Sequence, residues 1–437
     1  MNLRDKVALC YDFGLFESFA QKLSESFGKV FYYSEYMRGF PLSIEAAIGK
    51  GMPGLERVMD FDDHIDEADV LVFPDIYRGG LQERLRAEGK RVWGSGKAEE
   101  LEIERVKTKE YLQKLGLPLN KWKKITGIKP LKEYLKTVED KWIKTEGFRG
   151  DGETFHFDNF KLAEPRLNEL EYKLGPMGKQ RVFVIEDPID SLCEWGYDGY
   201  TVSGKYASFG IQGVEKKNEA YAGIVRPYDK LLKQLRTVNA KMAPALKGYD
   251  CNSLISTEVR ITKDGTGYFI DPCMRGASPA GECYQNLYTN WGEIVWHGSN
   301  GELIDPETEK GEIYGVEVLI NCDAGSRPWV PIYFPKEIEP FVKLRNAARI
   351  DGEYNVSNQE HGTIQVGAVV AKGKSFLIAC ERIAGYCKKI EGLGIEVKPE
   401  ALLGAFESMR ASEKMGLDVA PDPIPGEQEI LNALGKA

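Results

Sequence analysis

The sequence lacks the features that mark membrane, secreted and nucleic-acid-binding proteins. No apolar run approaches the roughly 20 residues that a transmembrane helix needs. The first residues, Met-Asn-Leu-Arg-Asp-Lys, lack the apolar segment of a signal peptide. The net charge is −9 and no cluster of Lys and Arg stands out, so there is no electrostatic footprint for nucleic acid. We therefore expect a cytoplasmic protein with neither a membrane nor a nucleic acid as its partner.

Cysteine and histidine are too sparse and too scattered to suggest a metal or nucleophile site. The eight cysteines include no Cys-x-x-Cys pair, and the four histidines are not paired at ligand spacing: His64, His156, His297 and His361. This pattern favours buried, reduced thiols over a disulfide framework or a zinc site. Nothing in the sequence points to a Ser–His or Cys–His nucleophile.

The length and the order of patterns predict several α/β units. A chain of 437 residues is too long for one compact core and predicts roughly two to four domains. Strands alternate with helices over about the first hundred residues, which predicts a parallel, doubly wound sheet. The predicted strands there are Lys6–Asp12, Lys29–Tyr36, Asp69–Pro74 and Arg91–Trp93. Residues Ala98–Leu115 are predicted to form one long charged helix.

Residues 253–282 contain a strong signal for a tight hairpin. Two alternating runs flank Asp264-Gly265, a dipeptide favoured in two-residue turns. With such a turn, Glu258 lies directly opposite Asp271. One face then carries Ser256, Glu258, Arg260, Phe269, Asp271, Cys273 and Arg275. The other, core-facing side carries Val259, Ile261, Tyr268, Ile270 and Met274.

Two carboxylates that face each other across a strand pair repel. Glu258 and Asp271 are tolerated there if a cation lies between them, and such oxygen ligands suit Mg²⁺ that also holds substrate phosphates. The alternative is a solvated sheet face on which Glu and Arg side chains pair. From the hairpin alone, both interpretations stay open.

Four further segments are informative because of their order along the chain. They are Val92–Ser95 with Gly116–Pro118, Trp142–Phe148 with residues 150–152, Val184–Asp187, and Asp271–Pro279. In this order they resemble the motifs of the ATP-grasp superfamily, and most of all those of the phosphoribosylamine–glycine ligases. The resemblance covers roughly residues 70–410, and residues 367–390 also resemble the C-terminal domain of those enzymes.

The resemblance implies an α/β protein (α+β overall) with the ATP-grasp fold and four parts. Residues 1–103 would form an N-terminal doubly wound domain. Residues 104–312 would form the ATP-grasp domain, with a mobile lid at about 122–186 and a central sheet. Residues 313–415 would form a small C-terminal domain, and residues 416–437 a tail.

The resemblance also implies which residues bind the phosphates of ATP. Lys144 ends a strand beside a glycine-rich turn, where its charge can meet phosphate oxygens while backbone N–H groups of Gly147, Gly150 and Gly152 cover the phosphate chain. The alternative is a surface lysine before a flexible turn. Arg105 stands where the family has its other phosphate lysine. Lys109, one helical turn further on the same face, could serve instead.

The adenosine and metal contacts follow from the same resemblance. Main-chain groups around Glu186 would bind adenine, and because Pro188 has no N–H, either Asp187 or Ile189 is the donor. Ribose hydroxyls would bind Glu194 or, as the alternative, Asp190; we favour Glu194.

In this interpretation Glu258 and Asp271 hold Mg²⁺, and Arg275 steadies the transferred phosphoryl group and the acyl phosphate, with Lys144 as the second catalytic residue. The expected cofactors are therefore ATP and Mg²⁺.

Three departures from the family pattern matter. Cys273 stands where the family has a metal-binding Asn, and a thiol is a poor ligand for a hard cation. Asp151 adds a negative charge to the phosphate loop. Residues Tyr11–Phe16 replace the glycine-rich segment that grips a ribose phosphate in glycinamide ribonucleotide synthetases. We therefore expect no substrate phosphate at that turn, and a substrate outside the purine pathway.

The function predicted from these residues is an ATP- and Mg²⁺-dependent carboxylate–amine ligase, which joins a small-molecule carboxylate to an amine through an acyl phosphate. One alternative is a catalytically idle ATP-binding module with a structural or regulatory role. A third is a phosphoryl-transferring enzyme of the same fold. The sequence names neither the acid nor the amine, and leaves open whether the protein is a monomer or a homodimer.

Overall fold

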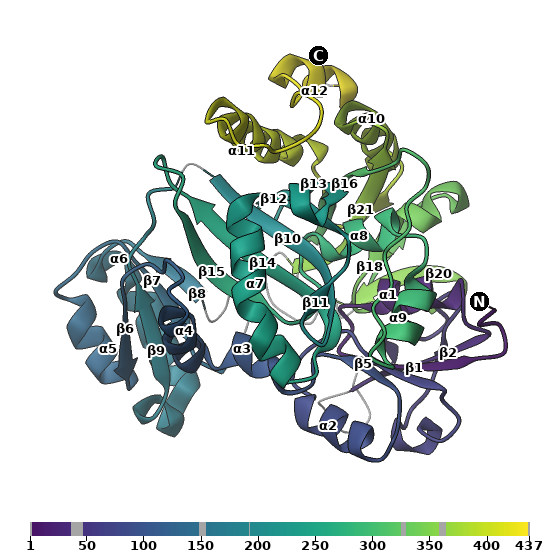
Figure 1. Ribbon diagram of the computed structural model, residues 1–437, viewed down its shortest axis with the longest axis horizontal. Helices are drawn as coiled ribbons and strands as arrows, with labels where there is room; N and C mark the ends of the chain where they lie inside the picture. The colour runs from purple at the N-terminus through teal and green to yellow at the C-terminus, as the bar shows by residue number, and fades with distance from the viewer. Residues whose placement is uncertain are drawn as a thin grey trace.

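The computed structural model describes residues 2–35, 47–147, 154–191, 193–324, 329–357 and 364–435. Its described strands form one 15-stranded sheet and two four-stranded sheets (Figure 1). No helix in these ranges is both long enough and apolar enough to cross a bilayer. All eight cysteines are free thiols, and seven of them are buried, as the scattered pattern predicted.

The N-terminal part of the large sheet is parallel and covered on both faces, as predicted. Its strands lie in the order β5 (Val92–Gly94), β4 (Val70–Phe73), β1 (Val7–Asp12), β2 (Lys29–Ser34) and β3 (Glu56–Arg57). Helices α1 (Glu17–Ser24) and α2 (Gly79–Ala87) alternate with these strands. Separate buried clusters lie on the two sides of the sheet, because strands buried on both faces carry nearly continuous apolar residues.

The central, antiparallel part of the same sheet carries most of the candidate site. Its strands are β10 (Cys193–Val202), β11 (Lys205–Tyr206), β12 (Phe209–Lys216), β13 (Ala220–Pro227), β14 (Asn252–Ile261) and β15 (Gly267–Cys273). Helix α7 (Lys233–Gly248) packs on one face of β10 and β14 (Figure 1). A single pair, Asn252 with Gly94, joins this part to the parallel strands.

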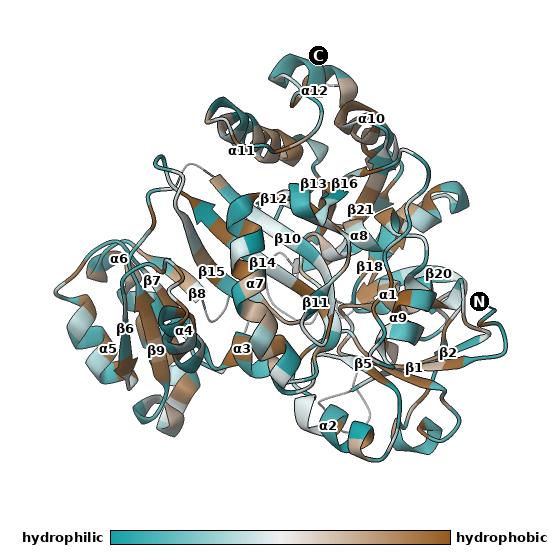
Figure 2. Cartoon of the chain, viewed as in Figure 1, coloured by the Kyte–Doolittle hydropathy of each residue, from teal (hydrophilic) through white to brown (hydrophobic). Residues whose placement is uncertain are grey.

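A separate four-stranded sheet covers the residues for which a lid was predicted. It comprises β6 (Trp122–Thr126), β9 (Val182–Glu186), β7 (Lys141–Thr145) and β8 (Thr154–Phe157), with α5 (Ile128–Leu135) and α6 (Phe160–Leu174). It has its own buried cluster, and Figure 2 shows β9, with the sequence Val-Phe-Val-Ile-Glu, as a mainly hydrophobic strand. The segment therefore has a core independent of the central sheet.

The C-terminal part extends the large sheet and adds a small sheet. The strands are β16 (Tyr314–Cys322), β17 (Trp329–Tyr333), β18 (Val342–Leu344), β19 (Ala347–Ile350), β20 (Glu353–Ser357), β21 (Ile364–Gly373), β22 (Glu391–Gly392) and β23 (Ile395–Val397). The helices are α10 (Phe376–Cys387), α11 (Leu402–Lys414) and α12 (Glu427–Ala433). They lie at one end of the molecule (Figure 1).

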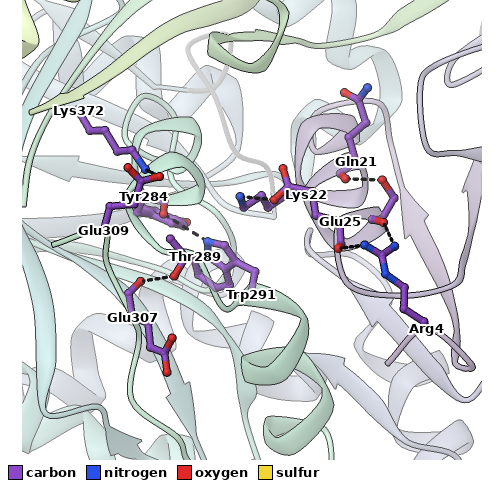
Figure 3. A network of polar contacts seen from close by, with 11 residues as sticks. Arg4, Gln21, Lys22, Glu25, Tyr284, Thr289, Trp291, Glu307, Glu309 and Lys372 are labelled. Atoms are coloured by element: carbon purple, nitrogen blue, oxygen red, sulfur yellow. Dashed lines mark hydrogen bonds and ion pairs between the residues drawn. The ribbon is translucent and has the colours of Figure 1, made fainter. Parts of the chain in front are cut away.

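Helices α8 (Gly281–Leu287) and α9 (Trp291–Gly298) join the central sheet to the N-terminal part. The ring of Trp291 lies edge-on to Phe19 of α1 at 5.3 Å. Figure 3 shows the indole N–H of Trp291 donating to the carbonyl of Tyr284 (3.3 Å), and Arg4 donating to carbonyls at the end of α1. Aromatic packing around Trp291, with its indole N–H hydrogen-bonded, stabilises this junction.

The prediction of one continuous helix over Ala98–Leu115 is wrong. The chain forms α3 (Glu100–Ile103) and α4 (Arg105–Lys114) with a break at Glu104. At the break, the carbonyl of Ile103 accepts the N–H of Gly147 (3.0 Å), and the N–H of Val106 donates to the Glu146 carboxylate (3.2 Å). The turn after β7 therefore supplies partners for the interrupted helix backbone, a tertiary contact that helix periodicity does not reveal.

Candidate active site

The hairpin forms, but not with the predicted turn. The loop has three residues: Thr262 donates its N–H to Thr266 (3.0 Å), and Gly265 takes a left-handed conformation at φ +81°. Ser256 nevertheless pairs with Cys273 as predicted, because a bulge between Thr257 and Val259 restores the register. The prediction that Glu258 directly faces Asp271 alone is therefore wrong, since Ile270 and Asp271 together face Glu258.

The bulge also corrects the faces assigned to β15. Phe269, predicted on the polar face, is fully buried in the core beside Val259 and Ile261. Ile270, predicted on the core side, lines the cavity described next. An extra residue in one strand exchanges the two faces beyond it, and the sequence gives no sign of where that residue lies.

One cavity of about 750 Å³ gathers most of the residues predicted for the site. Its lining residues come from the four-stranded sheet β6-β9-β7-β8, from the central sheet and from the C-terminal part of the chain. The predicted site residues that line it are Arg105, Lys144, Glu186, Asp187, Ile189, Glu194, Glu258, Asp271 and Arg275. Segments far apart in the sequence thus meet at one place.

Five of these side chains or their neighbours form what we call the paired-charge cluster: Arg105, Lys109, Lys144, Glu186 and Asp271. The Lys144 ammonium lies 2.5 Å from Asp271 and 3.3 Å from Glu186. Lys109 lies 2.8 Å from the other oxygen of Glu186, and Arg105 lies 3.4 Å from Asp271. Asn120 also donates to Glu186 (3.0 Å).

The pKa values of the cluster show that its charges satisfy one another. Burial opposes ionisation of Asp271, but the positive charges of Lys144, Arg105 and Lys109 hold its pKa at about 2. Burial likewise opposes ionisation of Glu186, yet Lys144 and Lys109 lower its pKa. Burial opposes the charge on Lys144, and the two carboxylates raise its pKa. Asp271 is therefore not strained by repulsion, as the sequence suggested, but held by cations.

A second group, which we call the acidic strip, has the opposite character. Glu194 of β10, Glu215 of β12 and Glu258 of β14 line the cavity from three neighbouring strands. Strand pairing places them on one face, because Gly196, two residues after Glu194, pairs with both Gly213 and Glu258.

The negative charges of the acidic strip are only partly balanced by nearby cations. Burial, together with Glu194, raises the pKa of Glu215 to about 8. Burial, Glu194 and Glu215 raise the pKa of Glu258 well above its ordinary value. Arg260 approaches Glu194 at 2.6 Å, and Lys217 partly offsets the raised pKa of Glu215. Burial and mutual repulsion thus favour the protonated forms of Glu215 and Glu258, and a divalent cation could take the place of those protons.

Arg275 is held in place by Glu102 of α3. Its Nε lies 3.0 Å from one carboxylate oxygen, and the other accepts the N–H of Met274 at 2.8 Å. The neighbouring Cys273 thiol points at the carbonyl of Arg275 (3.7 Å), and burial raises its pKa, so it stays a neutral thiol. A neutral thiol is not a metal ligand.

Backbone hydrogen bonds narrow two predictions: which N–H group contacts adenine, and which glycines cover the phosphates. The N–H of Asp187 donates to the carbonyl of Lys121 (2.8 Å), which leaves Ile189 as the donor of the two that were considered. Asp190 is exposed and does not line the cavity. The N–H of Gly147 donates to Ile103, whereas Gly150, Asp151 and Gly152 lie outside the described residues.

At the turn after β1, the carboxylate of Asp12 accepts hydrogen bonds from backbone N–H groups. It accepts the N–H groups of Gly14 (3.1 Å) and Phe16 (2.8 Å) and the hydroxyl of Tyr32 (2.7 Å). Two N–H groups of the turn before α1 therefore already have a side-chain partner. The expectation that no substrate phosphate binds at this turn stays a prediction.

Sequence reasoning missed several residues that line the cavity: Asn120, Trp142, Glu215, Lys217, Asn218, Ser278, Arg345, Asn346, Ser357 and Gln365. Strands β12 and β13 were not predicted, although Glu215 follows a run of alternating residues that could have indicated a strand. The C-terminal residues had no local signal, because strand pairing alone brings them to the cavity.

The donor set fits Mg²⁺ that is completed by a phosphate ligand. Among the described residues, no group of three or more His, Cys, Asp or Glu is arranged to hold a metal ion by itself. Glu258, Asp271 and Glu215 nevertheless present carboxylate oxygens to one cavity, and two of the three have raised pKa values. Hard oxygen ligands with open positions are what Mg²⁺ bound to nucleotide phosphates requires.

No protein-family model and no curated protein sequence matches this chain. Solved structures do match. Phosphoribosylamine–glycine ligase from Thermotoga maritima is 15% identical with a TM-score of 0.68, over 91% of this chain and 100% of that one. The L-amino acid ligase from Bacillus licheniformis is also 15% identical, with a TM-score of 0.58 over 89% of this chain and 99% of that one.

A third match holds nucleotide. The biotin carboxylase domain of Hydrogenobacter thermophilus 2-oxoglutarate carboxylase, in complex with MgADP and bicarbonate, is 13% identical with a TM-score of 0.63, over 94% of this chain and 95% of that one. The matched proteins share the ATP-grasp architecture, so the chain has the ATP-grasp fold, and the fold predicted from the sequence is confirmed.

Proposed function

We propose that the protein is an ATP- and Mg²⁺-dependent ligase that joins a small-molecule carboxylate to an amine through an acyl phosphate. The observation that carries the proposal is the meeting, in one cavity, of the paired-charge cluster, the acidic strip and Arg275. The names of the structurally similar proteins, two ligases and a MgADP-bound carboxylase domain, support the same kind of chemistry.

The paired-charge cluster would be the phosphate site. Lys144 and Arg105 now contact carboxylates, and phosphate oxygens would take over these contacts when ATP binds. Asp271 would thereby be released to Mg²⁺, together with Glu258. The N–H of Ile189 would contact adenine, and Glu194 the ribose hydroxyls, in exchange for part of its contact with Arg260. We propose that the lid, about residues 122–186, closes over the nucleotide.

Arg275 would stabilise the charge that develops on the transferred phosphoryl group. Its Nε is held by Glu102, so the guanidinium is oriented before substrate arrives. The acid substrate attacks the γ-phosphorus, ADP leaves, and the amine then displaces phosphate from the acyl phosphate. Positioning and charge neutralisation are sufficient for both steps, which agrees with the lack of a nucleophile motif in the sequence.

A second candidate, an idle ATP-binding module, is favoured by one observation. The neutral thiol of Cys273 replaces the family's metal-binding Asn and points away toward Arg275. Against this candidate stand Lys144, Glu258, Asp271 and Arg275, which all line the cavity.

An ADP-release screen tests the proposal. Purified protein with ATP and Mg²⁺ is offered pooled carboxylates, pooled amines, or both, while calorimetry measures ATP binding. The ligase predicts ADP and phosphate only when both pools are present. ADP without phosphate identifies a kinase, and ATP binding with no turnover identifies the idle module. Failure to bind ATP contradicts both candidates.

A further inference from the structure

A distinct group of polar residues lines another part of the cavity. Ser278 comes from the β15–α8 loop, and the others come from the C-terminal part of the chain: Arg345, Asn346, Ser357 and Gln365. We call this group the C-terminal subsite. None of these residues belongs to the paired-charge cluster or the acidic strip, and none was needed for the nucleotide contacts proposed above.

Arg345 is buried but only partly satisfied. Its side chain is 3% exposed, Nε lies 2.6 Å from Glu282, and Nη1 donates to Gln365 (3.3 Å). Among the described residues, the remaining nitrogen, Nη2, has no hydrogen-bond partner. The guanidinium of Arg345 is therefore held through Nε and Nη1, while its Nη2 keeps N–H donors without a described partner. Arg345 is one of the residues that line the cavity.

Ser357 provides a second free donor nearby in the fold. It is 1% exposed and lines the same cavity, and its hydroxyl has no partner within the described ranges. Its backbone N–H donates to the carbonyl of Asn346 (2.8 Å), the residue that follows Arg345. Leaving a buried donor unpaired is destabilising, so two such donors in one cavity point to a ligand that satisfies them.

The charges around the subsite favour a small monoanion. Arg345 and Arg275 line the same cavity and are close enough to repel one another electrostatically. Each is already paired on one side with a carboxylate, Glu282 and Glu102 respectively, and Glu317 also acts on Arg345. The excess positive charge is therefore small, and a planar carboxylate with two acceptor oxygens matches one guanidinium N–H edge and one hydroxyl. A doubly charged phosphate would lack hydrogen-bond donors for its further oxygens.

We propose that Arg345 and Ser357 form a second carboxylate-binding subsite, so that one substrate carries a carboxylate that the reaction does not consume. This inference rests on the proposed function and names the substrate class for it. The carboxylate belongs either to a dicarboxylic acid, of which the other end is activated at Arg275, or to an amino acid that serves as the amine.

Thermal melting tests the subsite independently of turnover. The probes are succinate with glutarate, a pool of L-amino acids, propionate with butyrate, and glycerol 3-phosphate, each with and without MgATP. We expect the dicarboxylates or the amino acids to raise Tm, which identifies the acid or the amine as the source. A shift with the monocarboxylates or the phosphate ester alone, or no shift with any probe, overturns the subsite.

Variants assign the shift to the subsite. Arg345→Lys keeps a cation beside Glu282 but removes Nη2, and Ser357→Ala removes a hydroxyl that holds no other group, so neither change should prevent folding. Each should abolish the ligand-induced shift and raise KM for the carboxylate substrate about tenfold, with ATP affinity unchanged. Arg349→Lys, an exposed arginine on β19 that contacts Gly352, is the matched control and should behave as wild type.

The outcomes separate the two proposals. If the carboxylate shift is present and lost in both variants while no acid–amine pair yields ADP and phosphate, the subsite stands and the ligase fails. If a ligase activity is found and its KM values are unchanged in Arg345→Lys and Ser357→Ala, the ligase stands and the subsite fails.

Discussion

The paired-charge cluster and the acidic strip line one cavity yet have opposite electrostatics. In the cluster, burial raises the pKa of Asp271, but the charges of three cations outweigh this effect and lower the pKa to about 2. In the strip, burial is reinforced by neighbouring carboxylates, and the pKa of Glu215 rises to about 8. The environment thus favours the charged form of Asp271 in one region and the protonated forms of Glu215 and Glu258 in the other.

This difference indicates what each region needs from a ligand. The cluster is complete without one, so an incoming phosphate must displace Asp271 and Glu186 from their cations. The strip is incomplete, so a divalent cation would stabilise it by replacing protons. Binding of ATP alone therefore disturbs the first region, and binding of Mg²⁺ satisfies the second.

The largest effect is expected from Asp271→Asn. The change removes a Mg²⁺ ligand, so ADP release should fall by orders of magnitude. It also removes the partner of Lys144 and Arg105, so the free energy of unfolding of the ligand-free protein should drop by roughly 1–3 kcal/mol. Urea denaturation measures this drop. Asp264→Asn in the hairpin loop is the control, and an equal loss there would assign the effect to the hairpin instead.

Lys144→Met should weaken ATP binding about tenfold or more, because one charge-assisted phosphate contact is worth roughly 1.5–3 kcal/mol. Calorimetry with MgATP measures the affinity. Lys124→Met on strand β6 of the same sheet, where the lysine is exposed, should leave it unchanged. Equal affinities in wild type and Lys144→Met would remove Lys144 from the phosphate site.

Glu258→Gln should have the opposite effect on stability to Asp271→Asn. The amide resembles the protonated acid that the strip favours, so the ligand-free variant should melt a few degrees above wild type at neutral pH. The additional stabilisation by MgATP should shrink, because a ligand is lost. Glu219→Gln, at an exposed turn, is the control. A lower Tm in the ligand-free variant would contradict the comparison between the two regions.

The smallest effect concerns pH. The pKa of Glu215 is about 8 in the folded protein against an ordinary 4.5. The folded state therefore binds the proton more tightly, so this contribution to stability is complete below about 4.5 and is lost as pH rises to about 8. Relative to wild type, Glu215→Gln should gain on the order of 1 kcal/mol between pH 7 and pH 8. Parallel pH profiles of the two proteins would contradict the raised pKa.

Local patterns predicted much of the fold. The alternation of β1, α1, β2, β4 and β5 gave the parallel sheet, because strands between helices pair in parallel. The order of the segments around Lys144, Glu186 and Asp271 gave the ATP-grasp resemblance, which the solved structures confirm as a fold. Strands β12 and β13 escaped prediction, since their glycine-rich runs weaken the strand pattern.

The register of the hairpin and the break in the long helix show why local reasoning stopped short. Asp264-Gly265 predicted a turn, but whether the loop has two or three residues depends on the bulge further along the hairpin. The break at Glu104 is matched to Gly147 and Glu146, more than forty positions away. The first error arises within one hairpin, from a bulge that the residue pattern does not mark, and the second arises from partners that are distant along the chain.

The sequence by itself determined which chemistry is available: Lys144, Glu258, Asp271 and Arg275 stand in motifs whose residue types suit phosphates and Mg²⁺. Only the tertiary structure decided their charge states and their neighbours. The pKa of a carboxylate depends on burial and on the charges within a few ångströms, and these are set by strand pairing. For the same reason only the fold brings Arg345 and Ser357, from the C-terminal part of the chain, to the cavity that the earlier motifs define.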